Sequence, residues 1–223
     1  MATQAHSAEI TPELVSRFPK NGPTDPIAYY RRPITGPLFR ERINLGLRML
    51  RGRRFARGLE VGYGAGAVLA ALSASVQELH GIDLDADPAT ATAALSEFSV
   101  KAELRAGSVY ELPYPDARFD LVVSFSTFEH LHRYELALSE VRRVLRPGGF
   151  FLLGMPAVNR MMEAGFLAIG FRGIDHHHVT TPRQVADRFA AHGFAVRERA
   201  SLKLPLVRGV GVPVYYNWLL ERT

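Results

Sequence analysis

A glycine-rich turn is the first segment of the sequence whose residue types and spacing suggest chemistry. Gly62, Gly64 and Gly66 follow the short apolar run Gly58–Val61. The small-residue segment Ala65–Ala74, which has helical character, begins within the same turn. Glycine suits such a turn because the backbone must bend sharply and lie close against a ligand. The first amides of a helix have no internal acceptor and can donate to polar ligand atoms. The spacing therefore predicts a ligand-binding loop between a strand and a helix.

The glycine spacing alone leaves the ligand open. Gly62-x-Gly64-x-x-Ala67 also fits the fingerprint of folds that bind NAD or FAD. Two acids favour a nucleoside cofactor other than a dinucleotide. Glu60 stands just before the first glycine, where a dinucleotide-binding fold normally carries an apolar residue. Asp83 ends the next predicted strand, where a carboxylate can accept hydrogen bonds from two ribose hydroxyls.

A longer block of sequence narrows the choice. It comprises Gly107–Asp116, Phe119–Ser124, Glu129–Leu131 and Glu140–Gly149. Together with the glycine loop, these segments resemble the class I S-adenosylmethionine (SAM)-dependent methyltransferases, in particular the methyltransferase type 11 family, over about residues 55–156. The resemblance implies SAM as cofactor and S-adenosylhomocysteine as product. It says little about the methyl acceptor.

The resemblance also implies a set of cofactor-binding residues. The backbone from Glu60 to Gly66 is expected to hold the methionine part of SAM, and Asp83 to accept from the ribose. Leu84, Ser108 and Val109 are expected around the adenine, although many relatives carry Asp at the position of Ser108. The full predicted set is Glu60, Gly62, Tyr63, Gly64, Gly66, Asp83, Leu84, Ser108, Val109, Ser124 and Phe125.

Two members of this set lie where the fourth predicted strand ends. Ser124 and Phe125 are expected beside the methyl group of SAM. Tyr63 departs from the pattern because relatives usually carry a small residue there. It is expected either to cover the cofactor or to face solvent.

Histidines supply the candidate catalytic groups. A hydroxyl acceptor usually needs a general base, and imidazole titrates near neutral pH. The candidates are His130 and His132 after the fourth strand, and the run His176–His178. We predict His130 and His177 as catalytic residues. No metal site is predicted, because no matching ligand spacing accompanies the histidine run and the chain has no cysteine.

Alternating patterns predict the elements that position these residues. Strands are expected over Gly58–Val61, Val76–Asp83, Val100–Gly107, Phe119–Phe125, Phe150–Met155, Phe194–Leu202 and Val212–Leu220. Helices are expected over Ala65–Ala74, Asp87–Phe98, Arg133–Leu145, Val158–Phe171 and Pro182–Ala191. Strands that alternate with helices predict an α/β fold with a Rossmann-like, doubly wound, mostly parallel seven-stranded sheet. The last strand is expected to be antiparallel.

An N-terminal arm and helix precede this sheet. Closely spaced prolines predict an extended arm up to residue 36, with a short helix near Pro12–Phe18. Residues 37–51 form an amphipathic helix in which Phe39, Ile43, Leu47 and Leu50 share one stripe. We predict two units: residues 1–54 as a cap, and residues 55–223 as the SAM-binding domain with an acceptor-covering insert at about 157–181.

Composition and charge limit the kinds of partner that the protein is expected to have. The net charge of +5 is concentrated in residues 31–57, which hold nine arginines and one acid. Such a segment is either a solvated surface or a docking site for an acidic partner. No secretory signal, membrane span or RNA-binding module is predicted, so we expect a cytoplasmic monomer or homodimer.

Several functions stay open at this point. The apolar stretches Met161–Phe171 and Leu202–Leu220 favour a small-molecule acceptor, and binding to nucleic acid is not expected. The main alternative is a nucleic-acid or protein methyltransferase that docks through the arginine-rich segment, with steeply salt-dependent binding. A nicotinamide oxidoreductase and a non-catalytic scaffold with the SAM fold are further alternatives.

Overall fold

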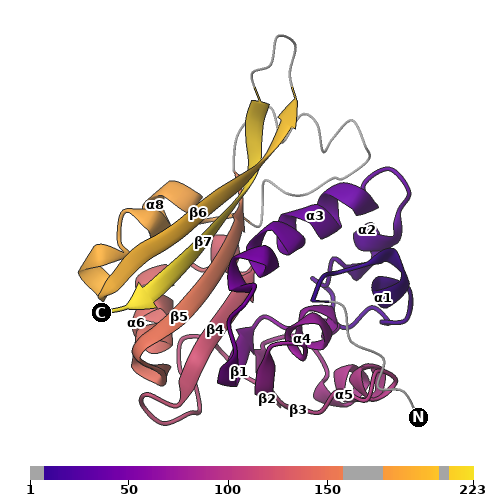
Figure 1. Ribbon diagram of the computed structural model, residues 1–223, viewed down its shortest axis with the longest axis horizontal. Helices are drawn as coiled ribbons and strands as arrows, with labels where there is room; N and C mark the ends of the chain where they lie inside the picture. Colours follow the sequence, from indigo (N-terminus) through magenta and orange to yellow (C-terminus); the bar gives the residue numbers. More distant parts are fainter. Residues whose placement is uncertain (1–7, 158–177, 206–210) are drawn as a thin grey trace.

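The computed structural model describes residues 8–157, 178–205 and 211–223 (Figure 1). The helices are α1 (Pro12–Ser16), α2 (Ile27–Arg31), α3 (Gly36–Leu47), α4 (Ala67–Leu72), α5 (Pro88–Ser96), α6 (Tyr134–Val144) and α8 (Pro182–Ala186). Three 3₁₀ turns are η1 (Arg48–Leu50), η2 (Phe128–His130) and η3 (Ala190–His192). The strands are β1 (Phe55–Val61), β2 (Val76–Asp83), β3 (Ala102–Ala106), β4 (Phe119–Phe125), β5 (Leu145–Pro156), β6 (Phe194–Pro205) and β7 (Gly211–Arg222).

The strands form one seven-stranded sheet in the order β3-β2-β1-β4-β5-β7-β6. The pairs from β3 to β5 are parallel, whereas β7 is antiparallel to both β5 and β6. The predicted fold class is therefore confirmed, including the antiparallel last strand. The order reverses between β1 and β4, so a ligand is expected outside the carboxyl ends of these central strands.

Helices cover both faces of the sheet (Figure 1). One core cluster joins the first three helices, α4 and α5 to one face, with Ile43 and Leu69 fully buried. The other joins α6 and α8 to the opposite face through residues such as Leu138 and Val185. β4 contributes residues to both clusters and is thus buried on both faces, which explains why it is almost continuously apolar.

The N-terminal segment is more ordered than the sequence predicts. It contains two short helices, α1 and α2, where a single one was expected. The apolar stripe of the third helix is buried as predicted: Phe39, Ile43, Leu47 and Leu50 are each no more than 5% exposed. This stripe packs α3 against the sheet and places the N-terminal segment beside the hairpin of β6 and β7 (Figure 1).

Local capping signals fix two helix starts. Asp87 caps α5 by accepting from the backbone of Ala89 and Thr90, with Pro88 in the first turn. Thr181 and Gln184 form a capping box at the start of α8. The helix expected over Pro182–Ala191 is interrupted, because α8 ends at Ala186 and only the turn η3 follows. The helix predicted over Val158–Phe171 lies outside the described residues.

Replacing Ile43 by alanine tests the packing of the N-terminal segment. Its side chain is 0% exposed, and a buried Ile→Ala change typically costs about 2–5 kcal/mol. Ile34→Ala is the matched control, since Ile34 is 84% exposed and should change stability by about 0.5 kcal/mol or less. Chemical denaturation measures both variants. Equal stability of the two would contradict this packing of α3.

Candidate active site

The loop between β1 and α4 takes a backbone shape that only glycine adopts easily. Gly62, Gly64 and Gly66 all have positive φ, at +81°, +50° and +93°. A Cβ atom on Gly62 would also collide with Thr127 Oγ1. The loop therefore lies against the segment that follows β4; backbone conformation favours glycine at all three positions, and lack of space requires it at Gly62.

Asp83 ties this loop to the end of β2. Its Oδ2 accepts from the backbone amide of Gly64 at 2.9 Å. Its Oδ1 accepts from the amides of Asp85 and Ala86, each at 2.9 Å. Three hydrogen bonds from N–H groups hold the carboxylate at the edge of the sheet. The turns after β1 and β2 are thereby joined through one side chain.

Glu60 lies beneath the same loop and is 2% exposed. Burial raises its pKa well above the ordinary value, and the negative charge of Asp83 adds to the effect. Its Oε2 has no hydrogen-bond partner among the described residues. A buried oxygen of this kind is costly unless a donor reaches it. The loop thus contains an acceptor suited to a donor group on a ligand.

The N-terminal segment adds a third carboxyl that the sequence analysis did not identify. Asp25 accepts from the amides of Asn21 and Ile27, at 2.8 and 2.9 Å. A Cβ atom on Gly64 would lie 3.4 Å from Asp25 Oδ1. Burial raises the pKa of Asp25, the two amides lower it, and the charge of Asp83 raises it further. No local sequence signal distinguishes this aspartate from a surface acid.

The residues predicted around an adenine lie along the same edge. Leu84, directly after β2, is 72% exposed, which is unusual for a large apolar side chain. Val109 is buried. Ser108 Oγ accepts from the amide of Tyr110 at 3.2 Å and so stabilises the turn after β3. Leu84 therefore offers an apolar surface that a flat ring could cover.

Three other predicted residues direct their side chains into the core. Ser124 is 0% exposed, and its hydroxyl donates to the carbonyl of Val61 at 3.0 Å. Phe125 is buried beneath Gly46 and Gly154. Tyr63 is buried between Gly81 and Ala86, so the expectation that it faces solvent is wrong, and its predicted contact with the cofactor stays a prediction. These residues can reach a ligand only through their backbone.

His130 lies in η2, after β4, and its side chain is 41% exposed. Its ring centroid is 5.3 Å from that of His178, and its Nε2 is 4.0 Å from Oε1 of Glu129. His177 lies outside the described residues.

Glu129, beside His130, is a site residue that sequence reasoning missed. Its side chain is 1% exposed. Burial raises its pKa to about 8, although a hydrogen bond from its own amide and the charge of Arg42 lower it.

Arg42 is a second missed residue at this edge. Its guanidinium lies over the rings of Phe39, Tyr30 and Tyr215, at 4.3, 5.5 and 5.2 Å from their centroids. Its Nη2 donates to the Tyr30 hydroxyl at 3.2 Å. A narrow apolar cavity adjoins it. The cavity is lined by Leu38, Phe39, Arg42, Pro156, Leu202, Val214 and Tyr215.

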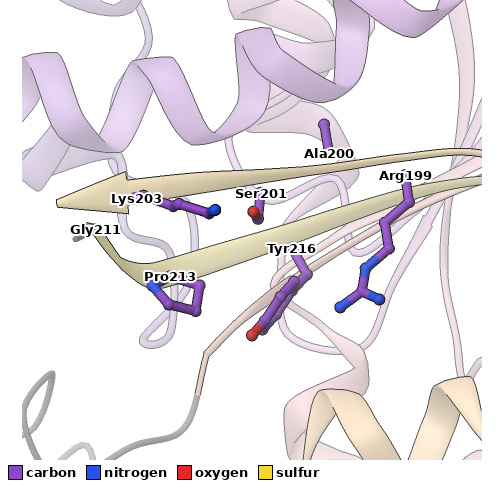
Figure 2. Close-up of a pocket in the computed structure, with 7 residues that line it drawn as sticks. All are labelled: Arg199, Ala200, Ser201, Lys203, Gly211, Pro213 and Tyr216. Carbon is purple, nitrogen blue, oxygen red and sulfur yellow. The ribbon is translucent and has the colours of Figure 1, made fainter. Parts of the chain in front are cut away.

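A larger hollow lies on the hairpin of β6 and β7, away from the glycine loop (Figure 2). Its lining includes Arg199, Ser201, Lys203 and Tyr216. The guanidinium of Arg199 lies 5.2 Å from the centroid of the Tyr216 ring. β6 is the edge strand, separated from β1 by β4, β5 and β7. This hollow is therefore distinct from the site at the carboxyl ends of β1 and β2, where Glu60, Asp83 and Asp25 converge.

Comparison with known proteins identifies the family of the segment that forms most of this edge. The family model described as "Methyltransferase domain" matches residues 59–153. Those residues begin in β1, include the glycine loop and Asp83, and end in β5. Residues 59–153 are a class I SAM-dependent methyltransferase domain. The resemblance deduced from the sequence is thereby confirmed.

Two curated relatives of this domain carry names that refer to small molecules. The "Ubiquinone/menaquinone biosynthesis C-methyltransferase UbiE" of Methylobacterium nodulans is 34% identical over 141 residues, covering 58% of this chain and 54% of the relative. The "Fatty-acid O-methyltransferase" of Mycolicibacterium smegmatis is 36% identical over 98 residues, covering 43% and 35%. The chain thus spans about a third to about half of the length of these relatives.

Solved structures support the fold independently. The N-methyltransferase NodS from Bradyrhizobium japonicum WM9 superposes with a TM-score of 0.62 at 20% identity, covering 83% of this chain and 97% of NodS. At this identity, the likeness shows a shared architecture and leaves substrate and chemistry open.

Glu60→Gln tests the protonation of the buried glutamate. Because the folded-state pKa lies above the ordinary 4.5, the contribution of Glu60 to wild-type stability is greatest below about pH 4.5 and falls as the pH rises towards the folded-state pKa. Glutamine does not ionise, so the variant does not lose stability in this way as the pH rises. The melting temperature of the variant should therefore rise relative to wild type between pH 5 and pH 8, by about 2–4 °C for each kcal/mol.

Differential scanning fluorimetry across this pH range makes the measurement. Glu111→Gln, at an exposed position, is the control and should keep a constant difference from wild type. A Glu60→Gln variant that loses stability relative to wild type as the pH rises would mean that Glu60 is ionised and favourably paired.

Proposed function

We propose that the chain binds SAM along the carboxyl edge of β1, β2 and β3 and transfers its methyl group to a small molecule. The observation that carries this proposal is the convergence of Glu60, Asp25 and Asp83 on the glycine loop. The pKa values of Glu60 and Asp25 are both raised, in part by the charge of Asp83. A ligand with positive charge would relieve this repulsion, and SAM carries an ammonium and a sulfonium group.

The residues at the edge fit the parts of SAM one by one. The unpartnered Oε2 of Glu60 suits the ammonium group, directly or through water. Asp83 has carboxylate lone pairs beyond those used by its three amide donors, and these suit the ribose hydroxyls. Exposed Leu84 suits the adenine face. Bound there, SAM supplies an electrophilic methyl group, and the protein must align the acceptor and exclude water.

The N-terminal segment is proposed to cap this site, as the predicted division at residue 54 requires. Asn21 Nδ2 donates to the carbonyls of Gly64 and Asp87, at 2.9 and 3.0 Å. The Asp87 amide donates back to Asn21 Oδ1 at 3.0 Å. Thr24 Oγ1 lies 3.4 Å from Asp85 Oδ2. These contacts hold the segment directly on the two turns that carry the candidate cofactor residues.

The acceptor is proposed to be a small, largely apolar molecule. The cavity beside Arg42 is lined mainly by apolar side chains from α3, β5 and the β6–β7 hairpin. The names of two relatives point the same way, one to a fatty acid and one to ubiquinone and menaquinone biosynthesis. His130 and His177 remain the predicted bases for a hydroxyl acceptor. The described residues contain no helix long and apolar enough to cross a membrane.

The arginine-rich segment gives the alternative little support. All nine of its arginines have partners within the chain, which are acids, backbone carbonyls or aromatic rings. They are Arg31, Arg32, Arg40, Arg42, Arg48, Arg51, Arg53, Arg54 and Arg57. Guanidinium groups that already have partners within the chain are less available to bind the phosphates of a nucleic acid. Steeply salt-dependent binding of RNA would nevertheless favour the alternative.

Calorimetry with SAM and S-adenosylhomocysteine tests the proposed function. Wild type should bind both ligands. Asp83→Ala and Asp25→Asn should each weaken binding by about tenfold or more, which corresponds to about 1.4 kcal/mol. Asp187→Ala is the control, because the Asp187 side chain is 71% exposed and lies at the end of α8, outside the proposed site. It should change the affinity by less than about twofold.

Melting scans of the same samples establish that each variant is folded. Saturation with ligand at about 100 times its dissociation constant should stabilise wild type by roughly 2.7 kcal/mol. A folded wild-type protein that binds neither ligand would contradict the proposal and favour a scaffold. Tight binding that survives both Asp83→Ala and Asp25→Asn would contradict the proposed location.

A further inference from the structure

Three potential metal ligands meet beside the end of β4, although the sequence predicts no metal site. Glu129 and His130 lie in η2, and His178 lies just before α8. One ligand atom from each of the three side chains lies within 4.8 Å of the others. His130 and His178 also approach ring to ring, with centroids 5.3 Å apart. The cluster brings together two imidazoles and one carboxylate from separate parts of the chain.

Backbone hydrogen bonds hold the two segments together. The amides of Val179 and Thr180 both donate to the carbonyl of Glu129, at 2.8 and 3.1 Å. The Thr180 hydroxyl donates to the carbonyl of Leu131 at 2.6 Å. The Thr180 side chain is itself buried. His178 is thus positioned by its direct neighbours in the chain, and its approach to His130 is a consequence of the fold.

The carboxyl of Glu129 provides an independent reason to expect a ligand. Its side chain is 1% exposed, and its Oε2 has no hydrogen-bond partner among the described residues. Arg42 acts on it through charge, but its guanidinium is held among aromatic rings and does not bond Oε2. An unsatisfied oxygen at this depth costs free energy. A cation bound between Glu129 and the two histidines would satisfy it.

The ligand types select a class of metal. Imidazole nitrogen suits zinc, iron, copper and nickel, whereas magnesium and calcium prefer oxygen ligands. Two histidines and one carboxylate leave at least one coordination position open, as in catalytic zinc sites. In a tetrahedral zinc site, with bonds of about 2.0–2.1 Å, ligand atoms lie about 3.4 Å apart. The observed spacing, within 4.8 Å, requires only modest rotation of the histidine side chains, of which that of His130 is exposed.

We propose that Glu129, His130 and His178 bind one first-row divalent transition-metal ion. His130 then serves as a metal ligand in place of the general base expected from the sequence. If the proposed methyltransferase function holds, on which this extension rests, the open position would bind an oxygen atom of the acceptor. The metal site itself is independent of SAM and can be tested without it.

Cobalt and zinc titrations of the full chain test the site directly. The protein is prepared without a histidine tag and stripped with a chelator. One equivalent of Co²⁺ should bind and give visible d–d absorption, and calorimetry with Zn²⁺ should show the same stoichiometry. Glu129→Gln, His130→Ala and His178→Ala should each weaken binding by about tenfold or more, since loss of even an outer-shell partner of a metal ligand typically costs about 10–100-fold.

His132→Ala is the matched control, because His132 is exposed, lies in the same loop and stands outside the cluster. Its affinity for Co²⁺ should equal that of wild type. Circular dichroism and binding of S-adenosylhomocysteine show whether the variants stay folded, which separates failure of the metal site from failure of the proposed function. Absence of stoichiometric binding would overturn the proposal. So would binding that survives in a folded Glu129→Gln, His130→Ala double variant.

Discussion

The candidate site depends on the hydrogen bonds that the Asp83 carboxylate accepts from the backbone. The carboxylate accepts from amides in the turn after β1 and in the turn after β2. Asn21 then bridges the same two turns from the N-terminal segment. Because the glycine loop, the end of β2 and the N-terminal segment form one hydrogen-bonded unit, the edge is organised by the protein's own contacts. A ligand that binds there needs little additional ordering of the chain.

The charges at this edge distinguish between the ligands that a glycine loop can accept. A dinucleotide would place its pyrophosphate against the loop, close to Asp83, Glu60 and Asp25. Any of these carboxyls that is ionised would repel the two phosphates in a partly buried environment. A cationic ligand reverses the sign of each interaction. The same glycine spacing is therefore compatible with both ligands, and the acids around it favour SAM.

Sequence patterns predicted the parts of the structure that local interactions determine. The bounds of β2 and β4 agree with expectation, because strand periodicity is local. Tyr63, Asp25, Arg42 and Glu129 were misjudged or missed. Their environments depend on residues far away in the chain, such as Gly81 beside Tyr63 and the aromatic rings around Arg42. The family resemblance supplied the fold and cofactor class but could not supply these contacts.

The proposed metal cluster also depends on contacts between distant parts of the chain, which local sequence patterns do not predict. Glu129 and His130 are adjacent in sequence, yet the third ligand depends on hydrogen bonds that bring Val179 and Thr180 to the carbonyl of Glu129. The proposed metal site therefore depends on tertiary contacts around the end of β4, whereas the proposed cofactor site follows the local glycine pattern.

A crystal structure of the protein with S-adenosylhomocysteine tests the central claim most directly. The account predicts that the ribose contacts Asp83, the adenine covers Leu84 and the amino-acid part lies against the loop from Glu60 to Gly66. Electron density for the nucleoside elsewhere, for example in the hollow beside Arg199 and Tyr216, would contradict it.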